Sequence, residues 1–350
     1  MTALDDLLTA VRASAEPAEV SPQFAPKADV GAWLASVAAA RAAADARAVR
    51  HRVIVDAASE RLFGTSIDAL LPPSPELERF TLTVAVPGPV QLGDVVPALT
   101  GVAPVGPEWY AAETAVTVQV TAPVSPTAAV VRLHGGAYWM GGGGVSERID
   151  RALLEQIAVT ANAAVLDVDN RLAPEHPYPA AIVDALCVLD AARAGAAGFV
   201  PSAVALAGTS SGAGAVTLAA CADALRPSAP LAALALIVPS VLLSDGPSSL
   251  RDDPAAWAAR QDLLRSYLGD IDPADPWVSP AVLPELPGMP PTFAAIAEFD
   301  EVAAGGPQLA AAIPGAESRT YPMTHTTAPP AVEAQVVQDT ARFLARHLLP

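Results

Sequence analysis

Short apolar runs that alternate with helical segments constrain the fold of this chain more than any other feature. The run AAVVRLH at 128–134 is apolar enough to be buried on both sides, which is typical of a strand in a sheet covered on both faces. Two alternating runs precede it, at 80–89 and 114–123. Five more strand-like runs follow it: AVLDVD (164–169), AVALAG (203–208), LAALALIVP (231–239), TFAAIAEF (292–299) and SRTYPM (318–323). Because helical segments lie between these runs, the chain is predicted to form an α/β fold with a mostly parallel, eight-stranded sheet and helices on both faces.

Two parts of the chain fall outside this alternation. Residues 1–75 hold alanine-rich segments with helical spacing, from Leu4 to Val11 and from Val30 to about Ala58. An insertion at 242–290 is rich in Pro, Asp and Trp. We expect residues 1–75 to form a helical cap, residues 76–350 to form the main α/β domain, and the insertion to contribute to the cap. The helices that flank the sheet are expected near 147–161, 179–195, 212–226, 302–312 and 331–348.

Composition and charge exclude several classes of function. Of the 350 residues, 52% are hydrophobic and 16% charged, so the chain can bury a sizeable core. The net charge of −17 argues against binding to nucleic acid or to anionic membranes, which needs clustered Lys and Arg. The first twenty residues lack the basic start of a signal peptide, which predicts a soluble, cytoplasmic protein. Cys187 and Cys221 form no Cys-x-x-Cys pattern and are expected to be buried free thiols, not metal ligands.

The stretch AGTSSGAG at 207–214 fits two unrelated chemistries. Its glycines resemble the cofactor loop of short-chain dehydrogenases, whereas Ser210 within G-x-S-x-G resembles a nucleophile elbow. The dehydrogenase interpretation fails because the only lysine, Lys27, lies far upstream, so no Tyr-x-x-x-Lys pair can follow the loop. In addition, the next strand-like run, LAALALIVP, carries no acidic residue to hold a ribose hydroxyl.

The elbow interpretation requires a base and an orienting acid that follow Ser210 along the chain in the order Ser, acid, His. Five histidines are present, and His51, His134 and His176 come before Ser210. Of the other two, His347 lies near the end of a helical stretch. His325 follows the strand-like run SRTYPM in a loop, and ligands of open α/β sheets bind beyond such strand ends. His325 is therefore the predicted base.

Asp300 is the predicted acid because it alone closes an apolar strand, in TFAAIAEFD. Most other Asp residues after Ser210 fall in the polar insertion. A simpler interpretation makes Asp300 the N-cap of the following helix, and both roles can hold together. Glu298, two residues earlier on the same strand face, is the reserve candidate.

Acyl transfer also needs hydrogen-bond donors for the developing oxyanion. The turn HGGAYW at 134–139 follows a strand directly and offers backbone N–H groups. The N–H group of Ser211, at the start of the helix after the elbow, would complete an oxyanion hole.

With HGGA (134–137), GTSSG (208–212) and DNRLAPEHPYPAAIVDA (169–185), the chain resembles the hormone-sensitive-lipase family of α/β-hydrolases over residues 75–350. The resemblance implies an α/β-hydrolase fold with an N-terminal helical cap and no cofactor. It implies esterase activity on short to medium acyl chains, with Ser210 as nucleophile, His325 as base and Asp300 as orienting carboxylate. By the same resemblance, Gly136, Ala137 and Ser211 supply the oxyanion N–H groups, and Gly135 keeps the turn open.

The chain departs from the family pattern at three positions. Ala137 replaces a glycine, so that its methyl group narrows the acyl pocket or shifts the turn; Thr209 replaces an acid; and Thr326 follows His325 where glycine is common. Tyr138, Trp139 and Thr209 are candidate pocket residues, with Trp257 a weaker one. The alternative for Tyr138 and Trp139 is that they only pack under the cap.

The sequence thus predicts a serine carboxylesterase that acts on a small-molecule ester. It leaves the oligomeric state open, with a homodimer as the candidate. One alternative is an amide, carbamate or lactone hydrolase with the same triad, since the acyl-enzyme chemistry is shared. A more distant one is a ligand-binding protein without catalysis.

Overall fold

The computed structural model of the chain describes residues 2–14, 24, 28–88, 91–99, 115–286 and 288–349. Its strands form one eight-stranded sheet, in the spatial order β1-β2-β4-β3-β5-β6-β7-β8. The strands are β1 (Glu78–Ala85), β2 (Ala115–Ala122), β3 (Ala128–Leu133), β4 (Ala163–Asp169), β5 (Val204–Thr209), β6 (Ala233–Ile237), β7 (Thr292–Phe299) and β8 (Glu317–Thr324). β2 is antiparallel to β1 and β4, and every pair from β4 to β8 is parallel. The predicted sheet is confirmed.

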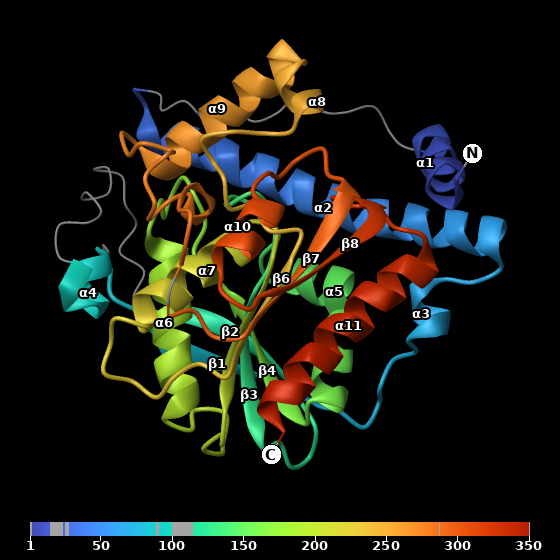
Figure 1. The fold of residues 1–350 in the computed structure, drawn as a ribbon. Coiled ribbons are helices and arrows are strands. Elements are labelled where there is room, and N and C mark those ends of the chain that lie inside the picture. The colour runs from blue at the N-terminus through green and yellow to red at the C-terminus, as the bar shows by residue number, and fades with distance from the viewer. Residues whose placement is uncertain are drawn as a thin grey trace.

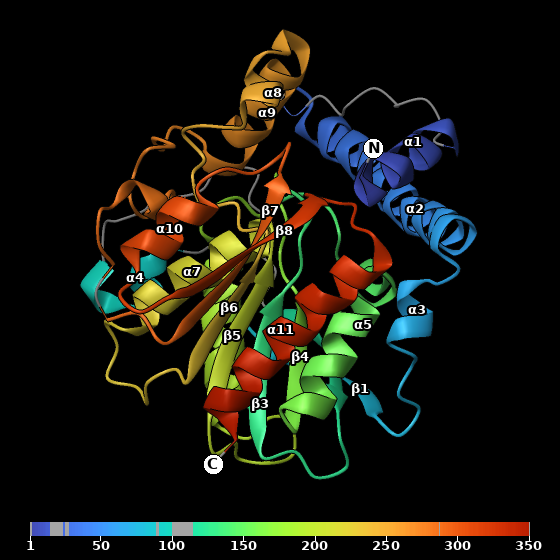
Figure 2. The same cartoon turned by 45° about the vertical axis from the view of Figure 1, so that its right-hand side comes forward.

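Helices cover both faces of the sheet (Figure 2), because alternate strand residues point to opposite sides. On one face, Val131 and Leu133 of β3 pack with α6 (Ala180–Arg193) and α7 (Ser211–Asp223). On the other face, Val130 packs with α5 (Gly144–Thr160) and α11 (Pro330–Leu348). The double burial of β3 explains why its sequence is apolar throughout.

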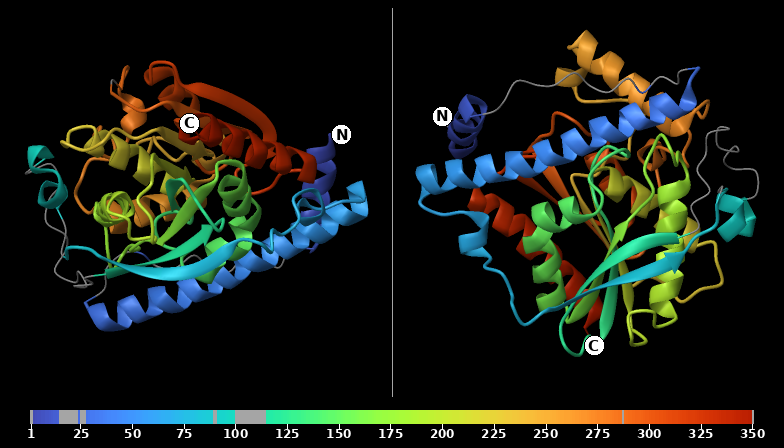
Figure 3. Two further views of the ribbon diagram at one scale, coloured as in Figure 1. Left: turned by 90° about the horizontal axis from the view of Figure 1, so that it is seen from below. Right: turned by 180° about the vertical axis from the view of Figure 1, so that it is seen from behind.

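The N-terminal residues form helices, the longest of which lies over the carboxyl ends of the strands (Figure 1). They are α1 (Ala3–Ser14), α2 (Val30–Phe63) and the short α3 (Ile67–Leu70). α2 runs across the whole width of the molecule, as the views in Figures 1 and 3 show. Both predicted N-terminal helices are present, and each is longer than expected.

The insertion forms α8 (Ser248–Arg251) and α9 (Pro254–Leu268) above the sheet, next to one end of α2 (Figure 1). Leu263 of α9 packs on the apolar cluster around Trp33 of α2. Short helical segments complete the described part of the chain: α4 (Leu92–Val95), η1 (Pro97–Leu99), η2 (Pro280–Val282) and α10 (Gly306–Ala312).

The helix expected near 302–312 begins later than predicted. α10 starts at Gly306 and its N-cap is Gly305, so Asp300 does not cap it. The carboxylate of Asp300 instead accepts hydrogen bonds from the N–H groups of Val302 and Ala303, in a turn that precedes the helix. In the described part of the chain, no helix combines the length and apolarity needed to cross a membrane.

Candidate active site

Ser210 lies on a sharp turn between β5 and α7. Its backbone has φ +54° and ψ −119°, a conformation that side-chain-bearing residues adopt rarely and that clusters at functional sites. Gly212 allows this turn, because a Cβ atom there would lie 2.3 Å from the carbonyl oxygen of His134 and 2.4 Å from that of Leu133. The turn therefore presents Ser210 at the carboxyl end of the sheet, as the G-x-S-x-G pattern predicted.

His325 follows β8 directly and contacts both other predicted triad residues. Its Nε2 lies 2.8 Å from Oγ of Ser210, and its Nδ1 lies 2.9 Å from Oδ2 of Asp300. Since an ionised carboxylate only accepts hydrogen bonds, Nδ1 carries the proton and Nε2 is left to accept from Ser210. The side chain of His325 is only 7% exposed, which keeps water away from this contact.

Asp300 comes directly after β7, at a point where the pairing of β7 with β8 shifts register. Burial would raise the pKa of its carboxyl group. The hydrogen bond and charge of His325 and the N–H groups of Ala303 and Val302 outweigh burial and hold the pKa below its usual value. Asp300 is therefore ionised at neutral pH and suited to orient an imidazole ring.

The reserve candidate Glu298 does not join this group; it lies exposed near the end of β7. Glu301, next to Asp300, does contact the triad, although the sequence reasoning missed it. Its carboxylate accepts a hydrogen bond from the backbone N–H of His325 at 3.1 Å. The sequence signal for Glu301 was only its position next to Asp300. His347, also set aside from the sequence, packs against Phe343 within α11.

The segment 134–141 after β3, called the oxyanion loop below, curls beside Ser210. A Cβ atom at Gly135 would lie 3.2 Å from Cβ of Ser210, so the loop approaches the nucleophile closely. Gly136 has φ +130°, and a Cβ atom there would overlap the carbonyl oxygen of Met140 at 1.9 Å. Ala137 and Tyr138 follow with φ +50° and +71°. The methyl group of Ala137 is thus accommodated within a left-handed turn.

Three backbone N–H groups around Ser210 are available for a ligand. Among the described residues, the N–H groups of Gly136, Ala137 and Ser211 donate no hydrogen bond to another protein group. The N–H groups of Trp139 and Met140 both donate to the carbonyl oxygen of Gly136, which closes the turn. The residues expected to form the oxyanion hole therefore lie together next to the nucleophile.

A cleft of about 720 Å³ opens at Ser210 and His325 and extends between α2, α5 and α11. Its lining is largely apolar and includes Trp139, Ala137 and Thr209. Trp139 also packs edge-on against Phe24, so it lines the cleft and does not only pack against neighbouring side chains. Thr209 accepts a hydrogen bond from the fully buried Arg132, which fixes its side chain at the cleft wall.

Two predicted pocket residues lie elsewhere. Trp257 is absent from the cleft lining and packs against Gly246 and Arg260. Tyr138 points away from the cleft, stacks on Tyr267 at a ring-centroid distance of 4.1 Å, and hydrogen-bonds Ser240. Both side chains pack against protein and do not line the cleft.

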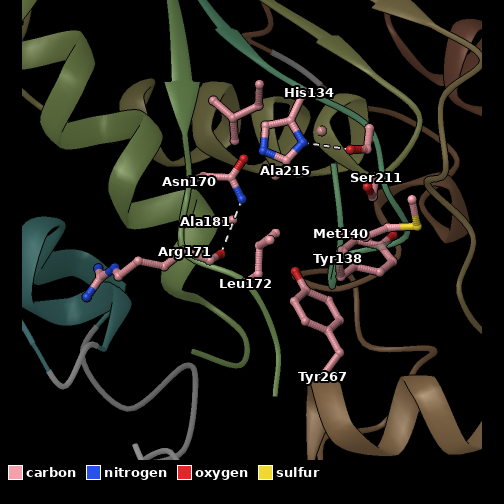
Figure 4. A pocket seen from close by; sticks show the side chains of 13 residues that line it. His134, Tyr138, Met140, Asn170, Arg171, Leu172, Ala181, Ser211, Ala215 and Tyr267 are labelled. Carbon is pink, nitrogen blue, oxygen red and sulfur yellow. Dashed lines mark hydrogen bonds between the residues drawn. The ribbon is translucent and has the colours of Figure 1, made fainter. Parts of the chain in front are cut away.

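Tyr138 and Tyr267 belong to a small cavity of about 10 Å³ behind the oxyanion loop, which Figure 4 shows from close by. His134 also lines it, and its Nδ1 hydrogen-bonds the carbonyl oxygen of Gly135 at 2.6 Å. Asn170 donates to the carbonyl oxygen of Arg171 on the opposite side. Asn170, Arg171 and Leu172 line the side of the cavity that faces the loop.

Cys187 and Cys221 are free thiols, as expected, but each is half-buried instead of fully buried. Burial raises the pKa of Cys187 to about 11 and that of Cys221 to about 12, so both are protonated at neutral pH. Within the described ranges, no three His, Cys, Asp or Glu side chains are arranged to hold a metal ion.

Fold and site together define a class of protein: an α/β protein in which a serine on a strand-turn-helix elbow meets a histidine and a carboxylate at the carboxyl edge of the sheet. The chain belongs to the family of the alpha/beta hydrolase fold, whose model matches residues 130–325. The resemblance drawn from the sequence motifs is thereby confirmed.

Named relatives match about half of the chain. An esterase of Acinetobacter venetianus is 33% identical over 181 residues, which cover 50% of this chain and 57% of the relative. The carboxylesterase NlhH of Mycobacterium tuberculosis is 34% identical over 183 residues, which cover 49% of this chain and 56% of the relative. The chain thus spans little more than half the length of these relatives.

Solved structures match nearly the whole chain. The esterase LipW from Mycobacterium marinum aligns with a TM-score of 0.64 at 22% identity, covering 99% of this chain and 98% of LipW. An esterase from the bacterial hormone-sensitive lipase family aligns with a TM-score of 0.62 at 20% identity, with the same coverage of both chains. At this identity the likeness concerns the fold, including the helices above the sheet.

Proposed function

We propose that the protein is a serine carboxylesterase that hydrolyses short- to medium-chain carboxylic esters. The observation that carries the proposal is the chain of contacts from Ser210 Oγ through His325 to Asp300, at 2.8 and 2.9 Å. These are hydrogen-bond distances, as a nucleophile, its base and the group that orients the base require. The names of the relatives, an esterase and a carboxylesterase, support the same reaction.

The geometry supports a two-stage reaction. In the first stage Oγ of Ser210 attacks the ester carbonyl carbon while Nε2 of His325 takes the hydroxyl proton. Asp300 stays ionised and stabilises the imidazolium, which its lowered pKa favours. The tetrahedral intermediate collapses, the C–O bond to the alcohol breaks, and His325 gives its proton to the leaving alkoxide. An acyl group then remains on Ser210.

In the second stage His325 removes a proton from water, whose oxygen attacks the acyl carbon. Collapse of this intermediate releases the carboxylic acid and returns the proton to Oγ of Ser210. In both stages the negative oxygen lies within reach of the N–H groups of Gly136, Ala137 and Ser211. Removal of one such donor typically lowers kcat by about 10² to 10³.

The cleft supports an ester with an apolar acyl or alcohol part. Its volume of about 720 Å³ lies within the range of roughly 300–1,000 Å³ that is usual for small-molecule sites. Side chains such as Ile149, Leu153 and Val337 line it away from Ser210 and offer a surface for alkyl groups.

Hydrolysis of p-nitrophenyl esters from acetate to laurate, by the wild type and by Ser210→Ala in parallel, tests the proposal. We expect turnover by the wild type, an optimum at short to medium chains, and a fall in kcat of about 10⁴ to 10⁶ in the variant. A folded wild type that cleaves none of these esters would contradict the proposal. Assays with the corresponding amides, carbamates and lactones then distinguish an esterase from the other hydrolases that use this triad.

We propose further that a small-molecule ester is the partner, that the chain forms a homodimer, and that it resides in the cytoplasm. The net charge of −17 supports the proposal that nucleic acid is not a partner, because phosphate binding needs clustered cations. Light scattering of the purified protein tests the dimer, and fractionation of the source cells tests the location.

A further inference from the structure

The cap helix α2 contacts the oxyanion loop through an apolar cluster and through two polar side chains. On one face of α2, Trp33, Val37 and Ala44 are buried against Trp139 of the loop. Arg41 and Asp45 lie on the same face, because Arg41 follows Val37 by four residues and Asp45 follows Arg41 by four. Neither side chain lines the cleft.

Arg41 joins three parts of the molecule. Its Nε donates to the carbonyl oxygen of Trp139 in the loop at 2.5 Å. Its two terminal nitrogens bind both carboxylate oxygens of Glu175, at 3.0 and 2.6 Å, and one of them also donates to the carbonyl oxygen of Ala173. A planar guanidinium fixes such a set of acceptors in one geometry, which an ammonium group cannot do.

Asp45, one helical turn further on, binds the loop two residues after the Arg41 contact. Its Oδ1 accepts the backbone N–H of Gly141 at 2.8 Å. Both contacts hold the last residues of the loop, directly after the left-handed residues Ala137 and Tyr138. Backbone in such conformations persists only where the surroundings hold it.

We propose that Arg41 and Asp45 are positioning residues that hold the oxyanion loop in its catalytic conformation from the cap. The inference rests on the proposed esterase function and adds that the cap acts on the reaction through the oxyanion donors. Ala173 strengthens the arrangement, because its N–H donates to the carbonyl oxygen of Tyr138 at 2.9 Å. Glu175, which belongs to the motif at 169–185, is the anchor of Arg41.

The role predicts a specific kinetic signature. Loss of Arg41 loosens the N–H groups of Gly136 and Ala137, which meet the negative oxygen of the transition state and not the neutral carbonyl of the substrate. We expect Arg41→Ala to lower kcat by about 10- to 100-fold with little change in KM. We expect Arg41→Lys to recover part of this loss.

The experiment measures kcat and KM on p-nitrophenyl butyrate and the inhibition constant of an alkyl trifluoromethyl ketone. Oγ of Ser210 adds to the ketone carbonyl, His325 takes the proton, and the resulting oxyanion occupies the oxyanion hole. Arg41→Ala should weaken this inhibitor by about the factor by which it lowers kcat. Asp45→Ala should act in the same direction, whereas Asp45→Asn, which retains an acceptor oxygen for Gly141, should stay close to the wild type.

Arg151→Ala is the matched control for loss of an anchored arginine. The side chain of Arg151 is 21% exposed against 19% for Arg41. It also binds carboxylates and a backbone carbonyl, those of Asp68, Glu155 and Leu71. Its partners lie away from the cleft, so we expect lower thermal stability with unchanged kcat and inhibitor affinity. Circular dichroism establishes that each variant is folded; if Arg41→Ala is not, Asp45→Ala decides.

The inference is overturned if Arg41→Ala and Asp45→Ala lower kcat no more than Arg151→Ala, or if they lower kcat and leave the inhibition constant unchanged. A wild type that neither cleaves the ester nor reacts with a fluorophosphonate at Ser210 would instead disprove the proposed function, and the inference would fall with it. Active wild type with unaffected variants disproves the inference alone.

Discussion

At the residue scale, the glycine two positions after the nucleophile sets how closely α7 can approach β3. Gly212→Ala would place a methyl group 2.3 Å from the carbonyl oxygen of His134, a backbone atom that cannot move away cheaply. We expect a loss of at least about 1–3 kcal/mol in unfolding free energy, measured by urea denaturation, together with lost reactivity of Ser210. Gly144→Ala is the control, since nothing lies within 4 Å of its added methyl. Equal stability of the two variants would contradict this reason for the elbow glycine.

Asp300 makes stability depend on pH in a defined direction. Its pKa is lower in the folded protein than in the unfolded chain, so its contribution to stability is fully present above the unfolded value of about 3.9. The contribution is lost as pH falls through the lower, folded value. Urea denaturation from pH 7 to pH 3 should therefore show the wild type more stable than Asp300→Asn at neutral pH, with the difference shrinking below about pH 4. A difference that grows with acidity would contradict the assigned direction.

At the element scale, a buried arginine joins β3 to its neighbours. Arg132 of β3 is fully buried and pairs with Asp167 of β4 at 2.8 Å and with Asp150 of α5. Arg132→Met would leave both carboxylates without their buried cation, at a cost of about 3–5 kcal/mol in unfolding free energy. Arg251→Met breaks an ion pair with Asp245 whose side chains are 50% and 46% exposed, and should cost less than about 1 kcal/mol. Similar losses in the two variants would show that burial does not decide the strength of these pairs.

The elements themselves were predictable where burial dictates composition. All eight strands lie at the expected runs, because a strand covered on both faces must be apolar, as β3 is from Ala128 to Leu133. Ser210 and His325 were found because a strand end in a parallel sheet fixes the edge at which a following side chain lies. Asp300 was found for the same reason, although the helix it was expected to cap begins only at Gly306.

The contacts between distant elements were not predictable. Arg41 lies 98 residues from Trp139 and 134 from Glu175, and nothing in the local sequence of α2 distinguishes it from its neighbouring arginines. The acceptor role of Glu301 depends on how the backbone turns after the register shift in β7. The direction of the Tyr138 side chain depends on a left-handed turn, which the pattern of apolar and polar residues in the sequence does not specify.

At the scale of the whole molecule, the cap is fastened at several points. Trp33 is buried against Trp139, Arg41 binds Glu175, and Arg52 binds Glu333 of α11. We therefore expect the cap to unfold together with the sheet, as a fixed wall and not a separate lid. In urea, tryptophan fluorescence and far-UV circular dichroism should show coincident transitions. A fluorescence transition at clearly lower urea would show that the cap detaches first.

The central claim is that Ser210 carries an acyl group during turnover. Mixing the protein with p-nitrophenyl butyrate, quenching in acid within the first turnovers and analysing the peptides by mass spectrometry tests it most directly. The account predicts one butyryl group on the peptide that contains Ser210, and none in Ser210→Ala. Ester hydrolysis by a folded wild type with no acylated Ser210 at any quench time, or undiminished hydrolysis by Ser210→Ala, would contradict it.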